Sequence, residues 1–423
     1  MVSSHRATLD HAYSYIRPRT YETVYDVTKF GAVGNGETDD SKAFQSAWKE
    51  ACENESNNAK VIVPGGKTFL VSATEFEGPF LSLLTISNKT HIHIYICTYQ
   101  ISGNIVAPSK SAWIKKSADE WLYFHQVDGL NVLGDGLIDG RGESWWKDND
   151  SDDSSRPTAL RFSHCNNLQV SGLKHSNSQK NHISITDCNG ATISHLQITA
   201  PQKSPNTDGI DISSSTNILI HDSVMATGDD CIAINAGTSN VFIANIECGP
   251  GHGISIGSLG KDGSYDEVEA IHVTNCTFKN TENGVRIKSW QGGSGFAKNI
   301  TFSKITFIEA DNPVIIDQYY CPHKKCANKV SKIHITFVFV SYLQQTSAVK
   351  ISDVTYTGLH GTSISKNATI NFSCSEVVPC TNIILDDVHI TSAYQKDSTS
   401  AHCINAQGKA HLVIPTVNCL SSI

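Results

Sequence analysis

The sequence predicts an all-β protein: a single-stranded, right-handed parallel β-solenoid with a capping helix near its N-terminus. Short runs rich in β-branched residues recur at steps of 23 to 30 residues, and Asn, Gly, Asp and Ser separate them. Such periods in strand-rich sequence indicate a solenoid or a propeller. A propeller blade needs four strands in about 40–45 residues, so the shorter steps found here, with about three strands each, favour one coil of a parallel β-helix.

The capping helix is predicted just behind Asp39 and Asp40. Apolar residues follow these two acids at helical spacing, at Ala43, Phe44, Ala47, Trp48 and Ala51. An open solenoid end exposes strand edges and apolar core, so we expect the helix to cover it. Residues 1–22 are polar, lack the apolar centre of a signal peptide and are predicted to be a disordered extension. Residues 23–423 are expected to form one β-helix domain.

The recurring runs share a length of three residues, and several follow an Asn. They lie at 130–132, 168–170, 191–193, 218–220, 241–243, 271–273, 300–302, 349–351 and 383–385. Between Val170 and Phe302 their third residues are 23, 27, 23, 30 and 29 positions apart. We therefore expect these third residues to stack on one another in successive coils.

Two apolar stretches without turn residues, 80–99 and 330–345, interrupt this pattern. One interpretation is that they are buried or additional strands. The alternative hypothesis is that both are intron sequence retained in a gene model, because the flanking sequence would continue well without them. The number of cysteines, 13, is odd, and Cys97 lies within the first stretch.

The charge balance restricts the partners. With 33 Lys and Arg against 41 Asp and Glu, the formal net charge is −8, which repels a phosphate backbone and argues against nucleic acid as a partner. No run approaches the ~18 apolar residues of a membrane span. We expect a monomer, and an acidic substrate would need a local basic cluster.

The cysteines indicate an oxidising compartment. Several lie close together in pairs: Cys231/Cys248, Cys321/Cys326, Cys374/Cys380 and Cys403/Cys419. Glycosylation acceptors of the Asn-x-Ser/Thr type occur at Asn54, Asn149, Asn275, Asn299, Asn367 and Asn371. Together they predict a secreted, disulfide-bonded glycoprotein. The cysteines lack the spacing of a zinc site, and no cofactor is expected.

Residues 204–288 contain four polar motifs, built around Asp208, Asp229-Asp230, His252 and Arg286-Lys288. Asp208 and Asp229 are 21 residues apart, and Asp230 and His252 are 22 apart. Each step is about one coil, so the motifs should stack in layers about 4.8 Å apart. Each motif alone has a simpler interpretation, as a turn or a solvated strand face. The one-coil spacing that the four motifs share favours a functional site over four separate turns.

Three carboxyl groups in one cleft raise one another's proton affinity, so we expect one to keep its proton while the others are ionised. Glycoside hydrolysis needs this combination of an acid for the leaving oxygen and a base for water. Arg286 and Lys288, spaced i and i+2 on a strand, would point to the same side and bind the carboxylate of an acidic sugar.

The four motifs, Asn-Thr-Asp, Gly-Asp-Asp, Gly-His-Gly and Arg-Ile-Lys, resemble in order and spacing those of the polygalacturonases of glycoside hydrolase family 28, particularly the plant branch. The similarity extends from residues 25–27 through 140–146 to Cys419. It implies a right-handed parallel β-helix that hydrolyses α-1,4-galacturonosyl linkages of de-esterified pectin with inversion, and we expect endo action in the cell wall.

The resemblance also implies roles for individual residues. It assigns Asp229 as the general acid, and Asp208 and Asp230 as the groups that activate water. His252 would support the acid and the substrate, and Arg286 and Lys288 would bind the galacturonate carboxylate. Further candidates for substrate contact are Asn206 and Tyr320. Inverting enzymes usually separate their carboxyl groups by ~6.5–9.5 Å, more than one coil spacing.

This sequence departs from the family pattern at both apolar stretches. Phe80 stands where plant relatives carry a Cys, so the usual partner of Cys52 is expected to be missing. Two other functions remain open. A β-helix pectate lyase would use the acids to bind Ca²⁺. A non-catalytic protein would be either a solenoid that binds pectin without cleaving it or a defective product of an intron-retaining gene model.

Overall fold

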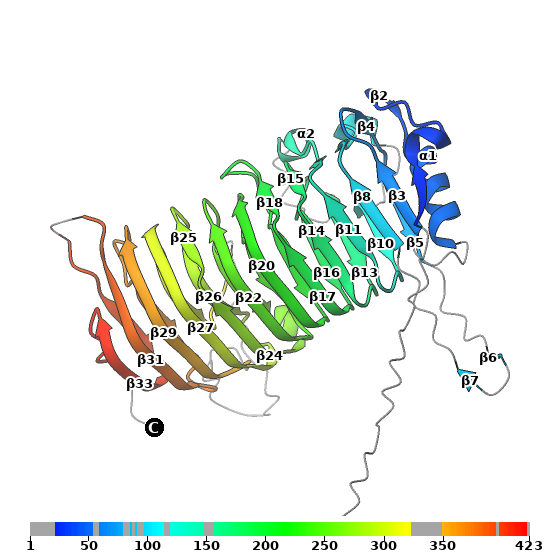
Figure 1. Cartoon of the computed structure of the whole chain (residues 1–423). Helices are drawn as coiled ribbons and strands as arrows, with labels where there is room; N and C mark the ends of the chain where they lie inside the picture. Colours follow the sequence, from blue (N-terminus) through cyan, green and yellow to red (C-terminus); the bar gives the residue numbers. More distant parts are fainter. Residues whose placement is uncertain are drawn as a thin grey trace, which may run out of the picture.

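A computed structural model describes residues 22–53, 59–78, 85–86, 89–90, 97–113, 119–147, 156–322, 349–394 and 397–420. Strands dominate it, and they stack coil on coil into an elongated parallel β-solenoid (Figure 1). Each coil contributes strands to two long parallel sheets, one of 20 strands and one of 11. The predicted all-β solenoid is thus observed.

The sheet with 11 strands carries the polar motifs. Its strands are β5 (Thr74–Glu77), β10 (Glu120–His125), β13 (Thr158–Ser163), β16 (Ile183–Thr186), β19 (Ile210–Ser213), β21 (Ile232–Ile234), β23 (Ile254–Leu259), β26 (Asn283–Ser289), β28 (Asn312–Asp317), β30 (Ile370–Ser373) and β32 (Ala401–Ile404).

The sheet with 20 strands closes the rest of each coil. Its strands are β1 (Thr23–Asp26), β2 (Asn35–Asp39), β3 (Ala59–Val63), β4 (Thr68–Leu70), β8 (Cys97–Ile101), β9 (Asn104–Val106), β11 (Asn131–Gly134), β12 (Leu137–Asp139), β14 (Leu168–Ser171), β15 (Lys174–Ser176), β17 (Asn189–Ser194), β18 (Gln197–Thr199), β20 (Thr216–Ala226), β22 (Thr238–Cys248), β24 (Tyr265–Thr274), β25 (Thr277–Lys279), β27 (Ser294–Ala310), β29 (Lys350–Ser363), β31 (Cys380–Ser392) and β33 (Ala406–Ile414). A separate antiparallel pair joins β6 (Thr85–Ile86) to β7 (Lys89–Thr90).

The predicted helix caps the N-terminal end. Helix α1 (Ser41–Trp48) is followed by a π-helical turn at Lys49–Glu53, and its five predicted apolar residues are all buried. Trp48 packs against the rings of Phe76 and Phe124 at centroid distances of 5.4 Å, which covers the first coils (Figure 1). Within the described residues the other helical segments are short: α2 (Glu143–Trp146) and 3-10 turns at Val27–Phe30, Lys110–Ala112 and Lys261–Gly263.

Identical interior positions stack along the solenoid. The third residues of the runs from Val170 to Phe302 are paired as predicted, each with its counterpart in the next coil. In the second sheet the rings of Phe76, Phe124 and Phe162 stack at 4.7 and 5.4 Å. Alternating side chains point inward, and these columns form one continuous apolar core.

The next run, 349–351, does not continue this column. Phe302 pairs with Tyr356 and not with Ile351, because β27 and β29 are long strands and residues 349–351 lie near the beginning of β29. Ile351 instead pairs with Ala297. The apolar triplet alone did not reveal this shift within a long strand.

The first apolar stretch ends inside the solenoid. Residues 97–99 belong to β8, which pairs with both β3 and β11, and Cys97 forms a disulfide with Cys52. Cys52 thus has a partner in Cys97, although Phe80 stands where the usual partner was expected. Residues 330–345 and the side chains of 80–96 lie outside the described residues, as do residues 1–21.

Three of the four predicted disulfide clips are present: Cys231–Cys248, Cys374–Cys380 and Cys403–Cys419. Cys326, the predicted partner of Cys321, lies outside the described residues. Cys165, Cys188 and Cys276 are free and buried.

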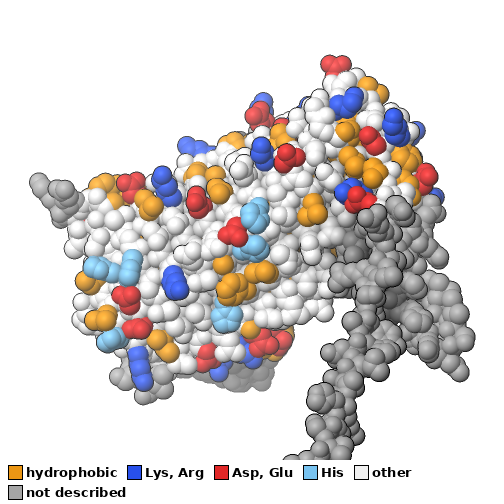
Figure 2. All heavy atoms as spheres, viewed as in Figure 1, with side chains coloured by type: hydrophobic (Ala, Val, Ile, Leu, Met, Phe, Trp, Pro, Cys, Tyr) orange, Lys and Arg blue, Asp and Glu red, His pale blue; other side chains and the backbone are white. Residues whose placement is uncertain are grey.

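The surface is mixed in charge. One face carries scattered acidic, basic and histidine side chains on a largely uncharged background, without a continuous basic stripe (Figure 2). Within the described ranges, the helices are too short or too polar to cross a bilayer.

Candidate active site

The predicted motifs converge where successive coils enter the second sheet. Asp208 precedes β19, Asp229 and Asp230 precede β21, His252 precedes β23, and the Arg-Ile-Lys motif lies on β26. These strands pair in parallel in this order, β19 with β21, β21 with β23, and β23 with β26. The site is therefore assembled from four consecutive coils.

Two glycines allow the polar residues to come this close. A Cβ on Gly228, just before the paired aspartates, would lie 2.0 Å from the carbonyl oxygen of Ser204. Gly253, just after His252, has φ +94° and would place a Cβ 2.2 Å from the oxygen of Gly284. Only glycine fits either position, because backbone of the adjacent coil occupies the space of a side chain.

Asp230 is fully enclosed by donors. Its Oδ1 accepts hydrogen bonds from Arg286 Nη2 at 2.9 Å and Ser255 Oγ at 2.8 Å, and its Oδ2 accepts one from Lys288 Nζ at 2.8 Å. The side chain is 1% exposed. Burial alone would raise the pKa of Asp230, but the charges of Lys288 and Arg286 outweigh it and hold that pKa below its usual value. Asp230 is therefore ionised.

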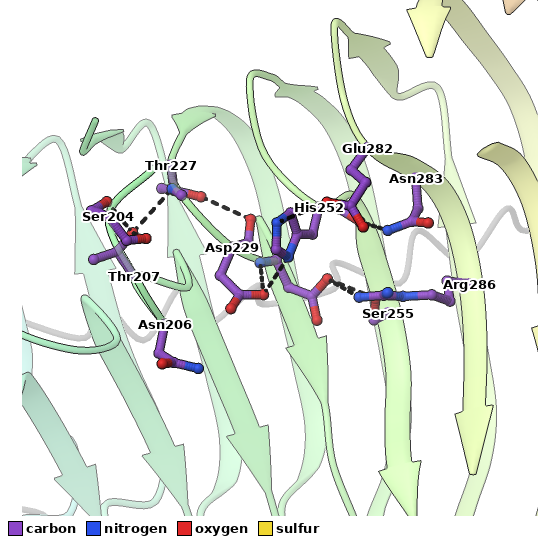
Figure 3. Close-up of polar contacts among 12 residues, drawn as sticks. Ser204, Asn206, Thr207, Thr227, Asp229, His252, Ser255, Glu282, Asn283 and Arg286 are labelled. Atoms are coloured by element: carbon purple, nitrogen blue, oxygen red, sulfur yellow. Dashed lines mark hydrogen bonds and ion pairs between the residues drawn. The ribbon is translucent and has the colours of Figure 1, made fainter. Parts of the chain in front are cut away.

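Asp229 is bound to His252 (Figure 3). Its Oδ1 accepts hydrogen bonds from His252 Nδ1 at 2.8 Å and from the backbone N–H of Asp230 at 2.9 Å. The backbone N–H of His252 also donates to the carbonyl of Asp229 at 2.7 Å. Within the described part of the chain, no partner contacts Asp229 Oδ2, and the side chain is 20% exposed. That oxygen can face a substrate.

The charged form of the Asp208 carboxyl group is disfavoured. Burial is the largest cause that raises the pKa of Asp208 well above its usual value, and the nearby charges of Asp229, Asp211 and Asp230 add to it. The backbone oxygen of Asp208 accepts a hydrogen bond from the N–H of His182 at 2.8 Å. The raised pKa of Asp208 and the lowered pKa of Asp230 thus set these two neighbouring carboxyl groups apart.

Asp211 and Ser255 were not predicted. They lie in one ladder with Arg286, since Asp211 pairs with Ala233, Ala233 with Ser255, and Ser255 with Arg286. Burial, followed by the charges of Asp230 and Asp229, raises the pKa of Asp211 to about 7. Each of the three polar residues stands between two aliphatic residues of its strand, so alternation would have placed all of them on the outer face.

The two further candidates differ in position. Tyr320 lies beside the site: its ring centroid is 5.3 Å from Lys288 Nζ and 5.6 Å from the ring of Trp290. Asn206 is held by Arg156, which donates from Nη2 to Asn206 Oδ1 at 2.7 Å and from Nη1 to the carbonyl of Pro205 at 2.6 Å. Arg156 escaped prediction because it is 50 residues away in sequence.

Among the described residues, Asp229, Asp230 and His252 have possible metal-ligand atoms within 4.8 Å of one another. Both oxygens of Asp230 already accept hydrogen bonds, two of them from fixed cations. Ca²⁺ takes six to eight oxygen ligands. This donor set, with an imidazole and adjacent positive charges, does not fit Ca²⁺ and argues against the lyase chemistry considered above.

Comparison with known proteins identifies the family. Residues 52–344 and 340–413 match the family described as glycosyl hydrolases family 28. The chain belongs to that family. It is therefore a glycoside hydrolase by descent, and the polar cluster lies at the centre of the matched region.

Curated relatives in the family cover most of the chain. A probable polygalacturonase of Arabidopsis thaliana is 45% identical over 414 residues, which are 97% of this chain and 84% of the relative. A polygalacturonase of Prunus persica is 40% identical, with 94% and 93% covered.

Solved structures share the fold. An endo-xylogalacturonan hydrolase from Aspergillus tubingensis superposes with a TM-score of 0.73 at 24% identity, covering 92% of this chain and all of the other. A polygalacturonase from Erwinia carotovora gives a TM-score of 0.66 at 20% identity, covering 96% and 100%. The solenoid of this hydrolase is a right-handed parallel β-helix, as predicted.

Proposed function

We propose that this protein is a polygalacturonase that hydrolyses α-1,4-galacturonosyl linkages of de-esterified pectin. The observation that carries this proposal is the cluster of Asp208, Asp229 and Asp230 beside two largely buried cations in a family 28 hydrolase. Glycoside hydrolysis by two carboxyl groups needs one proton donor and one acceptor. The two cations supply the local positive charge that a chain with a net negative charge needs to bind an acidic sugar.

In this proposal Asp229 protonates the leaving glycosidic oxygen through Oδ2, the carboxyl oxygen that no described residue contacts. Asp230 stays ionised between Arg286 and Lys288. Asp230 takes the proton of the attacking water, and Asp208 helps to position that water. His252, bound to Asp229 Oδ1, stabilises the negative charge that Asp229 acquires when its proton leaves.

Arg286 and Lys288 bind the galacturonate carboxylate with the donors that Asp230 does not use. Arg286 donates from Nη2 to Asp230 and from Nε to Ser255. Among the described residues its Nη1 has no partner and is available for a second bond. The ammonium of Lys288 has three protons, one of which is directed at Asp230. Tyr320, stacked near this ammonium, and Asn206 would line the same cleft.

We also propose that residues 23–423 act as one secreted, monomeric catalytic domain in the plant cell wall, with endo action on homogalacturonan. The disulfides support an oxidising compartment. Pectin is the polysaccharide partner. A size analysis of early products would test endo action, since long intermediate oligomers appear only when internal bonds are cut.

The test is release of reducing ends from polygalacturonic acid at mildly acidic pH by purified protein. Asp229→Asn should lower kcat by about 10²–10⁴-fold, the usual contribution of a general acid. The control is Asp187→Asn, on an exposed turn after β16, which should leave kcat unchanged. A fully active Asp229→Asn variant, or a product with an unsaturated end, would refute the proposal.

The stereochemical outcome needs its own measurement. Oxygens of Asp229 and Asp230 lie within 4.8 Å, closer than the usual ~6.5–9.5 Å of inverting enzymes. Inversion is therefore proposed from the family and not from this spacing. Proton NMR of the first product during the reaction should show the inverted anomer, and the retained anomer would reject it.

The two apolar stretches can be tested in the same assay. Because residues 97–99 form part of β8, the informative deletion removes 80–96 and 330–345 and keeps Cys97. Activity only in the shortened chain would support the retained-intron hypothesis. Activity in the full chain would mean that the solenoid tolerates both stretches.

A further inference from the structure

Glu282 lies on the side of His252 that faces away from Asp229 (Figure 3). Its Oε2 is 3.3 Å from His252 Nε2, while His252 Nδ1 is 2.8 Å from Asp229 Oδ1. The imidazole ring thus bridges two carboxylates. None of the four motifs in the sequence includes Glu282.

The backbone of Glu282 is fixed at this position. Its N–H donates to the carbonyl of Gly251 at 2.8 Å, and the next residue, Asn283, donates from Nδ2 to the carbonyl of His252 at 3.2 Å. On the following coil, Asn312 donates to the Glu282 carbonyl from both its backbone N–H and Nδ2 at 2.9 Å. The coils on either side of Glu282 therefore fix its backbone beside His252, and its Oε2 lies within reach of the ring.

Glu282 also borders open space. A pocket of about 340 Å³ next to the site is lined by His252 and Glu282, with Lys203, Thr281 and Asp311 among the other residues. The side chain of Glu282 is 58% exposed, compared with 31% for His252. Water in the pocket can therefore reach the outer end of the imidazole ring.

We propose that Glu282 is a positioning residue for the hydrolysis: it holds His252 as an imidazolium whose Nδ1–H points at Asp229. This inference rests on the proposed function, in which Asp229 is the general acid. When Asp229 gives its proton to the leaving oxygen, the imidazolium stabilises the carboxylate that forms. Glu282 keeps that imidazolium charged at pH values where a histidine without this partner would be neutral.

The charged surroundings of His252 agree with this role. Burial lowers the pKa of His252, but the hydrogen bond and charge of Asp229, followed by the charges of Glu282 and Asp230, outweigh it and raise that pKa above its usual value. Lys203 and Asp311 are the other charged groups lining the pocket. Asp230 is neutralised by its own two cations, so Glu282 is the second anion that acts on the ring after Asp229.

The experiment is the pH profile of kcat on polygalacturonic acid for the full chain and for Glu282→Gln. The amide keeps the size of the side chain and removes its charge. An exposed ion pair of this kind should move the alkaline limb down by about 0.5 pH unit, which is a ~3-fold loss of kcat above the limb. At acidic pH, where His252 is protonated without help, kcat should match the parent.

The matched control is Asp311→Asn, which removes a carboxylate from the same pocket without touching His252. Its alkaline limb should stay in place. A double-mutant cycle adds a second readout: in a His252→Gln background, Glu282→Gln should change kcat by less than about 1.5-fold, because Glu282 acts through the ring. Glu282→Asp should restore part of the shift.

Three results would overturn the inference. A uniform loss of kcat at every pH would mean that Glu282 only stabilises the turn, and a raised KM with an unmoved limb would mean that it contacts substrate. Equal shifts in Glu282→Gln and Asp311→Asn would mean a general effect of pocket charge. If the parent chain releases no reducing ends while folded, the proposed function fails first, and the inference falls with it.

Discussion

Replacing Asp211 by asparagine should stabilise the protein at neutral pH. Asp211 lies on β19 in a buried cluster of acids, and its Oδ2 accepts a hydrogen bond from Asn181 Nδ2 at 2.8 Å. Its Oδ1 is buried without a partner among the described residues. An ionised carboxylate here is disfavoured by desolvation and by Asp230 and Asp229, whereas an amide is neutral and its oxygen can keep the bond from Asn181.

The magnitude follows from proton linkage. The pKa of Asp211 is about 7, against 3.8 for an unperturbed aspartate, and each pKa unit corresponds to about 1.4 kcal/mol. The folded protein binds this proton more tightly than the unfolded chain does. Protonation of Asp211 therefore stabilises the fold fully below pH ~3.8, and this stabilisation is lost as the pH rises to about 7. The full difference is about 4 kcal/mol, so we expect Asp211→Asn to stabilise by about 2–4 kcal/mol at pH 7 and above.

The assay is thermal unfolding of the parent and of Asp211→Asn across pH 4 to 8. For a chain of this length, about 1 kcal/mol shifts Tm by roughly 1 °C, so the variant should gain roughly 2–5 °C at pH 7 and almost nothing near pH 4. Asp187→Asn, on an exposed turn, should show no such pH-dependent gain. A variant with unchanged or lower Tm at pH 7, or a gain of equal size at pH 4, would refute the reasoning.

Three other substitutions test the packing and the charges. Lys288→Met should destabilise the protein by about 3 kcal/mol near neutral pH, because it leaves the buried Asp230 with one cation. Denaturant titrations should show that this loss of stability becomes smaller in acid, where Asp230, whose pKa is lowered, becomes protonated. Phe124→Ala should cost about 3–5 kcal/mol in the same titrations, because it empties the middle of a three-ring stack; a loss below about 1 kcal/mol would contradict that packing. Cys97→Ser should lower the free energy of unfolding by about 2–4 kcal/mol, because it removes the disulfide with Cys52. Peptide mapping without reduction should find Cys97 linked to Cys52 in the parent. A free Cys97 thiol would be inconsistent with the structure.

The coil arrangement could be predicted because one period governs it. Runs of β-branched residues at steps of 23 to 30 residues predict both the solenoid and the register of Val170 to Phe302. The same period predicts that Asp208, Asp229 and His252 lie on successive coils, as they do. Tyr356 was missed because a long strand has several apolar positions, and spacing does not say which of them continues a column.

The site itself was only partly predictable. Asp230 and the two cations were placed together correctly, and strand alternation would also have found Asp211 and Ser255. Glu282 could not be assigned in this way. It lies in a turn, where no periodicity fixes the direction of the side chain, and its contact with His252 depends on backbone bonds between coils.

The cap formed by α1 has a consequence for how the protein is made. Each coil pairs with the one before it, and the capped end leaves the ribosome before the coils that follow it. Coils can therefore fold in the order of synthesis, each pairing with the strand edges of the folded coil before it. The helix covers the opposite end, so no strand can pair there. The catalytic coils would fold during translation, before the cysteines of the C-terminal disulfides have been synthesised.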